Sequence, residues 1–285
     1  MPVITDDRLV AVLATYEARV DRVLQQIRDD PDAALAEDRS SDAAHHPVRG
    51  PLRVAAALGR GVKDRVLDPV VGVVRGRHYP GQAGWLDLPA DRRARWWVGR
   101  ISTWAAGPAA LPWVAGKLSD RLPIKDALSA SAQGLVVCAV CREYGVDDPE
   151  RRISLLAEVL AGRRIEPAAV GAVLARRTPE AADASDEPEP PEAFDQDVEE
   201  SVPEHRRGVV RRAGRTLWSL ARVVREVPDL LDERQKGHLA ARALGMLPGV
   251  GVVGGYLAER TALGRAGDRT EELLASRFGI GTARH

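Results

Sequence analysis

The stretch IKDALSASAQGLVVCAVCREYGVDDPERRISLLAEVLAG, residues 124–162, indicates the fold class more clearly than the rest of the chain. Its first half predicts a buried helix, Ile124–Tyr144, with the apolar run GLVVCAVC at its centre. Gly145 can end this helix in the left-handed conformation. One of the two aspartates that follow can cap a second helix beginning at Pro149, where the missing proline N–H costs nothing. The stretch therefore predicts two consecutive helices.

Helical spacing continues on both sides of this stretch. Apolar residues recur at steps of four and three between Leu9 and Ile27, and Thr5 is placed to cap that helix. The other predicted helical segments are Leu52–Arg77 with a break at Pro69, Ala90–Gly107, Pro167–Arg177, His205–Val227, Asp229–Leu247 and Leu257–Phe278. No segment alternates convincingly as a strand would. We therefore predict an all-α protein.

One segment, Thr178–Glu204, differs from everything around it. It holds eleven acidic residues, no basic residue and five prolines. Such a segment buries too little apolar surface to order itself, so we predict a disordered linker between two helical halves. The expected organisation is an N-terminal helical arm and loop (1–51), a first helical part (52–177), the linker (178–204), and a second helical part (205–285) that packs on the first.

The bulk composition of the 285 residues excludes some classes of function. The 41 basic and 41 acidic residues cancel, so no overall field draws nucleic acid to the chain. Two cysteines provide no disulfide framework, and the first ten residues lack the regions of a secretory signal. No uninterrupted apolar run reaches the ~18 residues of a membrane-spanning helix. We therefore expect a cytoplasmic protein. Peripheral attachment to the inner membrane is compatible with this location.

The uncharged stretch ALGMLPGVGVVGGYLA, residues 243–258, is interrupted by five glycines and a proline. It contains a literal G-x-G-x-x-G, but no strand and no βαβ unit surround it, which argues against dinucleotide binding. The glycines Gly245 and Gly249, and likewise Gly251 and Gly255, are spaced four apart. Such pairs let two helices approach closely, so we predict helix packing here, with shallow membrane insertion as the alternative.

The sequence offers no convincing catalytic or metal-binding arrangement. Cys138 and Cys141 form a C-x-x-C in the middle of the apolar helix, where buried, inert thiols are expected. The histidines are scattered, and the common hydrolase, protease and P-loop motifs do not occur. We therefore expect no catalytic residue, cofactor or metal site, and a protein that is not an enzyme. A hydrolase with an unrecognised site is kept as an alternative.

The helix His205–Val227 is strongly basic and has one apolar face. Arginines beside an apolar face and a tryptophan suit an anionic membrane surface or a membrane protein. Nucleic acid is a weaker expectation because aromatic residues for base stacking are missing, and a solvated helix paired with nearby acids is the plain alternative. The predicted membrane or partner surface comprises Arg206, Arg207, Arg211, Arg212, Arg215, Trp218 and Arg222, with Trp96 and Trp97 from the tryptophan-rich middle of the chain. For these tryptophans, packing in the core is an equal alternative.

The opposite charges of neighbouring segments suggest one more hypothesis. The acidic segment 178–204 directly precedes the arginines of 205–227, so its carboxylates could mask them until an anionic surface competes. A separate hypothesis concerns residues 9–27, whose heptad-like seam packs either on its own domain or on a second copy.

Two blocks of the chain carry a resemblance to a known family. In Asp120–Gly162 an apolar helix ends in Tyr144-Gly145, aspartates follow, and then a leucine-rich helix; in Leu244–Gly279 an apolar helix with proline and glycine runs into a polar amphipathic one. Both blocks resemble the EcsC family and, more distantly, helical domains attached to some bacterial GTPases. The resemblance implies an α-helical bacterial protein of a kind that is often associated with membranes. It provides no catalytic residue that could be carried over to this chain. The acidic segment and the tryptophan-rich middle depart from the family pattern.

These features together lead to one expected function and its alternatives. We expect a non-enzymatic, EcsC-like helical protein that associates peripherally with the cytoplasmic membrane in an accessory or scaffold role. A soluble helical module that binds an apolar ligand or a partner helix in a glycine-lined groove is the first alternative, and the hydrolase is the second.

Overall fold

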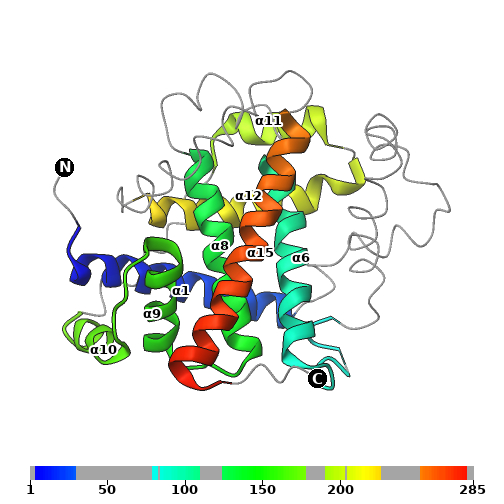
Figure 1. Cartoon of the computed structure of the whole chain (residues 1–285). Helices are drawn as coiled ribbons and strands as arrows, with labels where there is room; N and C mark the ends of the chain where they lie inside the picture. Colours follow the sequence, from blue (N-terminus) through cyan, green and yellow to red (C-terminus); the bar gives the residue numbers. More distant parts are fainter. Residues whose placement is uncertain are drawn as a thin grey trace. The chain divides into compact units, whose positions relative to one another are not determined.

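A computed structural model describes residues 4–29, 79–82, 84–109, 124–177, 190–202, 204–225 and 251–280. These residues contain eight α-helices and no β-strand, which confirms the predicted all-α class (Figure 1). The helices are α1 (Asp6–Asp29), α6 (Ala90–Ala109), α8 (Ile124–Glu143), α9 (Pro149–Ala161), α10 (Pro167–Ala175), α11 (Glu192–Ser201), α12 (Glu204–Val224) and α15 (Gly251–Phe278).

The chain divides into two compact units. One comprises residues 1–25 and 89–285 and therefore includes helices from both sides of the acidic segment. The other comprises residues 26–88. Its described part includes a turn in which the backbone N–H of Gln82 donates to the carbonyl of Tyr79 over 3.1 Å. The predicted helices Leu52–Arg77 and Asp229–Leu247 lie outside the described residues.

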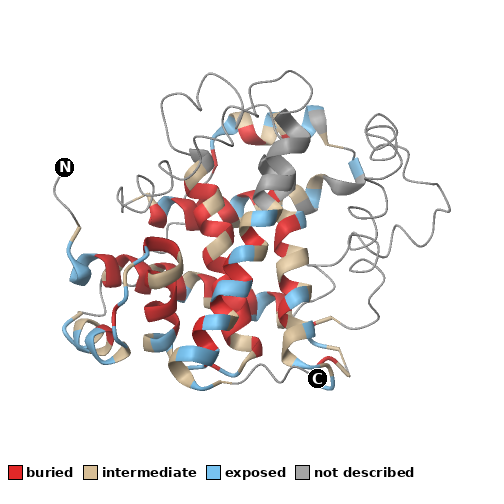
Figure 2. Ribbon diagram, viewed as in Figure 1, coloured by how far each residue is buried: buried red, intermediate tan, exposed pale blue. Residues whose placement is uncertain are grey.

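Helix α8 is the centre of the larger unit, because α6, α9, α12 and α15 all pack against it (Figure 1). Its central run is buried on every side: Leu135, Val136 and Val140 are at most 1% exposed. Figure 2 shows buried residues gathered along α8 and on the faces of the neighbouring helices. An all-round apolar sequence is what a helix surrounded by other helices requires.

The link between α8 and α9 has the predicted capping geometry. Gly145 adopts a positive φ of 74°, which glycine reaches without steric cost. The side chain of Asp148 accepts a hydrogen bond from the backbone N–H of Glu150 over 3.0 Å, and Pro149 occupies the first turn of α9. Local sequence signals therefore determine both where α8 ends and where α9 begins.

Helix α1 packs into the same core and is not a separate arm. Leu9, Leu13 and Val20 of the predicted seam are completely buried. The hydroxyl of Tyr16 donates to the carbonyl of Ser131 on α8 over 2.5 Å. Gly134 makes this crossing possible, because a Cβ at that position would lie only 2.7 Å from Cε1 of Tyr16. In this structure the seam therefore packs on the chain's own domain, which is the first of the two interpretations given above.

The acidic segment contains the main correction to the predicted organisation. Residues 192–201, which we predicted to be part of a disordered linker, form helix α11. Phe194 and Val198 lie one turn apart on this helix and are both buried, at 1% and 0% exposure. Composition alone missed them because two apolar residues are few among so many acids, yet their spacing places both on one face. Residues 178–189 lie outside the described residues.

Candidate functional site

Helix α12, which carries the predicted arginine surface, is anchored by its apolar face. Leu217, Leu220 and Val224 of that face are at most 3% exposed, and the helix packs against α8 and α6. The apolar residues that suggested membrane insertion therefore already have a partner inside the fold. What α12 presents to its surroundings is its polar face.

The polar face of α12 is dominated by arginine. The helix contains six arginines and one acidic residue, Glu204. Arg212, Arg215 and Arg222 are exposed, whereas Arg207 and Arg211 are half-buried; Arg206 lies on the helix, but its side chain is outside the described part. We call the described members, Arg207, Arg211, Arg212, Arg215 and Arg222, the arginine surface.

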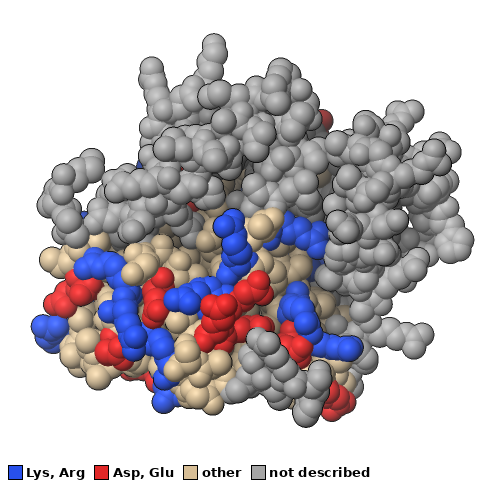
Figure 3. Space-filling view, viewed as in Figure 1, with Lys and Arg blue, Asp and Glu red and all other residues tan. Residues whose placement is uncertain are grey.

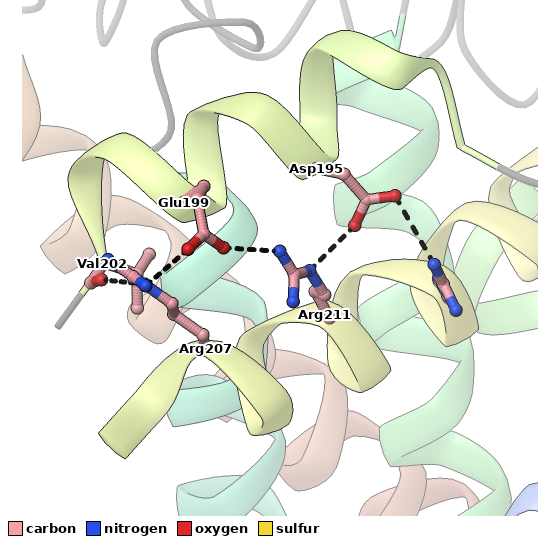
Figure 4. Close-up of polar contacts among 6 residues, drawn as sticks. Asp195, Glu199, Val202, Arg207 and Arg211 are labelled. Atoms are coloured by element: carbon pink, nitrogen blue, oxygen red, sulfur yellow. Dashed lines mark hydrogen bonds and ion pairs between the residues drawn. The ribbon is translucent and has the colours of Figure 1, made fainter. Parts of the chain in front are cut away.

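Helix α11 lies along part of this arginine surface (Figure 4). Oε1 of Glu199 is 2.5 Å from Nη1 of Arg207, and its Oε2 is 2.7 Å from Nη2 of Arg211. Oδ1 of Asp195 is 3.0 Å from Nε of Arg211, and its Oδ2 is 3.4 Å from Nη2 of Arg215. Two carboxylates one turn apart on α11 thus engage three consecutive turns of α12.

An aromatic contact fixes the position of α11. The ring of Phe194 lies against the backbone of Gly214 on α12, where a Cβ would come within 2.6 Å of Cε2 of the ring. Glycine in the middle of a helix is unfavourable by itself, so its presence here is explained by the room it gives the ring. Sequence reasoning raised the pairing of the α12 arginines with acids of the preceding segment, and the structure shows it at Asp195 and Glu199. It did not identify Phe194 or Gly214, because their relation is a contact between two helices.

The face of the molecule seen in Figure 3 differs from the arginine surface. There, the described basic and acidic side chains are interspersed. Helix α15 contributes pairs of this kind: Nη1 of Arg277 is 2.6 Å from Glu158, and Nη1 of the exposed Arg269 is 3.2 Å from Glu272. An interspersed surface has little net attraction for an anionic partner. On α12, six arginines stand against one acidic residue, and the acids that pair with three of them belong to a different helix, α11; this makes α12 the candidate site.

Two of the predicted surface tryptophans are core residues. Trp97 is 2% exposed, and its Nε1 donates to the buried carboxylate of Glu143 over 2.9 Å. Trp218 is 8% exposed. The prediction that these two rings form a membrane or partner surface is therefore wrong for this structure. Trp96 is half-buried and packs edge-on against Trp97, with ring centroids 5.0 Å apart.

Only part of the predicted glycine-packing site is described. Gly251 and Gly255 lie in the first turns of α15, but their surroundings are outside the described part, as are Gly245 and Gly249 altogether. Close packing by a glycine of α15 does occur further along the helix. A Cβ at Gly267 would lie 2.9 Å from Cγ2 of Val98 on α6.

The C-x-x-C of α8 has no environment for thiol chemistry. Cys138 and Cys141 are both free and buried. Burial raises the pKa of Cys138 well above its usual value, and it raises the pKa of Cys141 to about 12. At neutral pH both groups are therefore protonated thiols, whereas a nucleophilic cysteine needs a lowered pKa and access to solvent.

We expect both cysteines to resist a thiol reagent in the folded protein. Titration with an aromatic disulfide reagent at pH 8 should modify them far more slowly than a small free thiol, because burial keeps them both protonated and inaccessible. In denaturing guanidinium both should react quickly, which provides the internal control. Rapid modification of the native protein would contradict the assignment of these thiols to the core.

The described residues also show no metal site and no spanning helix. No group of three or more histidine, cysteine or acidic side chains among them is arranged to hold a metal ion. None of the described helices combines the length and the apolar character needed to cross a membrane.

Comparisons with known proteins add no relative to this description. No protein-family model matches the chain, and neither the curated proteins nor the solved structures contain a significant match.

Proposed function

We propose that this chain is a non-enzymatic helical protein that binds an anionic membrane surface peripherally through the arginine surface of α12. The observation that carries the proposal is the division of α12 into a buried apolar face and an outer face with arginines on successive turns. The helix fixes the spacing of these arginines along the chain before any partner arrives. Each basic residue near an anionic bilayer contributes about 1 kcal/mol to binding.

The mode of binding follows from which face of α12 is available. An amphipathic helix that inserts into lipid needs its apolar face free, and that face of α12 is packed on α8 and α6. The proposed contact is therefore electrostatic and sensitive to salt. Phosphate groups of lipids fit guanidinium forks well.

An accessory or scaffold role at the cytoplasmic face of a bacterial membrane completes the proposal. Support comes from the resemblance of residues 120–162 and 244–279 to the EcsC family, which stays a prediction. The described helices offer binding surfaces and no arrangement of catalytic groups that we recognise, which favours attachment over chemistry.

Charge reversal at two exposed positions tests the proposed function. We expect the variant R212E/R222E to bind mixed vesicles of phosphatidylcholine and phosphatidylglycerol with an affinity lowered by about tenfold or more. The reason is that two attractive charges become repulsive. Binding is measured by cosedimentation at low salt and again at 0.5 M salt, where wild-type binding should also fall.

The matched control is R92E/R265E, which makes the same charge change at two exposed arginines of α6 and α15. This control should retain most of the wild-type binding. Equal losses in the two variants would mean that net charge alone drives binding. Absence of binding by every form of the protein, wild type included, would overturn the membrane proposal in favour of a module for a partner helix or an apolar ligand.

A further inference from the structure

Helix α11 occupies part of the surface through which the proposed function acts. We infer that α11 is a displaceable intramolecular cover, and that an anionic membrane competes with its carboxylates for the guanidinium groups of Arg207, Arg211 and Arg215. The inference rests on the proposed function and adds its regulation: with α11 docked, the arginine surface is partly closed, and with α11 released, it is fully open.

The contacts of α11 have the chemistry that a lipid phosphate would have. Four carboxylate oxygens, two from Asp195 and two from Glu199, lie 2.5–3.4 Å from guanidinium nitrogens of α12. Arg211 is held by both acids at once (Figure 4). Arginine binds carboxylate and phosphate through the same planar fork. The two ligands therefore exclude one another at these side chains.

The docking is weak enough to be reversed. Asp195 and Glu199 are 37% and 53% exposed, and ion pairs so exposed to water contribute little each. A helix of ten residues is also marginal by itself in water, so release of α11 also favours its melting. Because α11 precedes α12 closely in the chain, its tethering supplies a high local concentration that restores the closed state once the competitor is gone.

The position of α11 depends on an uncharged contact that can be changed separately from the ion pairs. Phe194 rests on Gly214, and Val198 is buried one turn further along. A methyl group at 214 would displace the aromatic ring, while alanine favours the helical state of α12 itself. The substitution Gly214→Ala thus loosens the cover without altering any charge.

Gly214→Ala is best compared with Gly208→Ala on the same helix. A Cβ at Gly208 meets nothing within 4 Å, so this control makes the same chemical change in open space. The two readouts are cosedimentation with phosphatidylglycerol vesicles at low salt and hydrogen exchange of the backbone amides of 192–201. For G214A we expect affinity for the vesicles to rise about tenfold and exchange in α11 to accelerate, since overpacking a close contact disfavours the docked state. G208A should resemble the wild type in both.

A second pair of variants tests the charged part of the contact. D195N/E199Q removes the two carboxylates that pair with α12. E192Q/E200Q removes the same number of charges from exposed positions of α11, of which Glu200 accepts a hydrogen bond from Gln196 within that helix. If α11 is a cover, the first pair strengthens vesicle binding clearly more than the second. If simple repulsion between α11 and the membrane is at work, both pairs strengthen it equally, which would overturn the inference.

The outcomes separate this inference from the proposed function. Addition of phosphatidylglycerol vesicles to the wild type should accelerate exchange in residues 192–201, and phosphatidylcholine vesicles should not. Vesicle binding that is equal in the wild type, G214A and G208A, although α11 exchanges faster in G214A, would overturn the cover and leave the proposed function intact. If none of these proteins binds anionic vesicles, the proposed function itself fails.

Discussion

Replacement of Glu17 by leucine is expected to lower the free energy of unfolding by about 3–5 kcal/mol, because it leaves a buried guanidinium without its carboxylate. Nε of Arg152 donates to Oε1 of Glu17 over 2.7 Å, and the two side chains are each 8% exposed. Asp21 also pairs with Arg152, at 3.6 Å from Nη2, but it is 39% exposed, so we expect it to offset only a small part of the loss. Urea unfolding followed by far-ultraviolet circular dichroism measures the loss.

The double variant E17L/R152M should recover much of that loss. Burial raises the pKa of Glu17 even though the charge of Arg152 opposes the change. The burial of Arg152 disfavours its charge, yet its pKa is also raised, because its attraction to Glu17 and other acids exceeds this cost. Replacing both members of such a pair with apolar groups is often neutral or stabilising.

The exposed pair Asp91–Arg95 provides a control for the buried pair. Its variant D91N should change stability by less than about 1 kcal/mol. A single variant E17L as stable as the wild type would show that the buried pair does not hold α1 on α9.

The variant Leu13→Ala is expected to lose about 2–5 kcal/mol of stability, as buried leucines generally do when a cavity replaces them. Leu13 is completely buried in the larger unit, so the loss should not depend on protein concentration. Unfolding curves recorded over a hundredfold range of concentration measure this. R22A, at an exposed position of the same helix, should stay within about 0.5 kcal/mol of the wild type. A loss in L13A that grows on dilution would instead assign the seam to an interface between copies.

The parts of the fold that the sequence predicts well are those determined by neighbouring residues. The end of α8 at Gly145 was predicted correctly, and the cap of α9 was narrowed to two neighbouring aspartates, of which Asp148 is the cap. The apolar seam of α1 is a periodic signal of the same local kind, and the apolar centre of α8 is a continuous run that indicates burial on every side.

The parts that were missed depend on contacts between distant segments. The sequence around Trp97 does not distinguish a buried ring from a surface ring. Trp97 can be buried because its Nε1 donates to Glu143, which lies 46 residues later in the chain. In α11 the acidic residues dominate the composition, whereas the helix is held by Phe194 against Gly214 and by carboxylates against arginines of another helix. Local propensity contains no information about such pairs.

The position of α1 has a consequence for how the protein is made. This helix precedes its partners along the chain: Tyr16 bonds to a carbonyl 115 residues later, Glu17 to an arginine 135 residues later, and Arg19 to a carbonyl 200 residues later. Folding dominated by such distant contacts is slow, and apolar surface exposed in the meantime favours aggregation. Until α8, α9 and α12 have been synthesised, α1 lacks the segments to which it bonds, and the seam around Leu13 is open to other nascent chains.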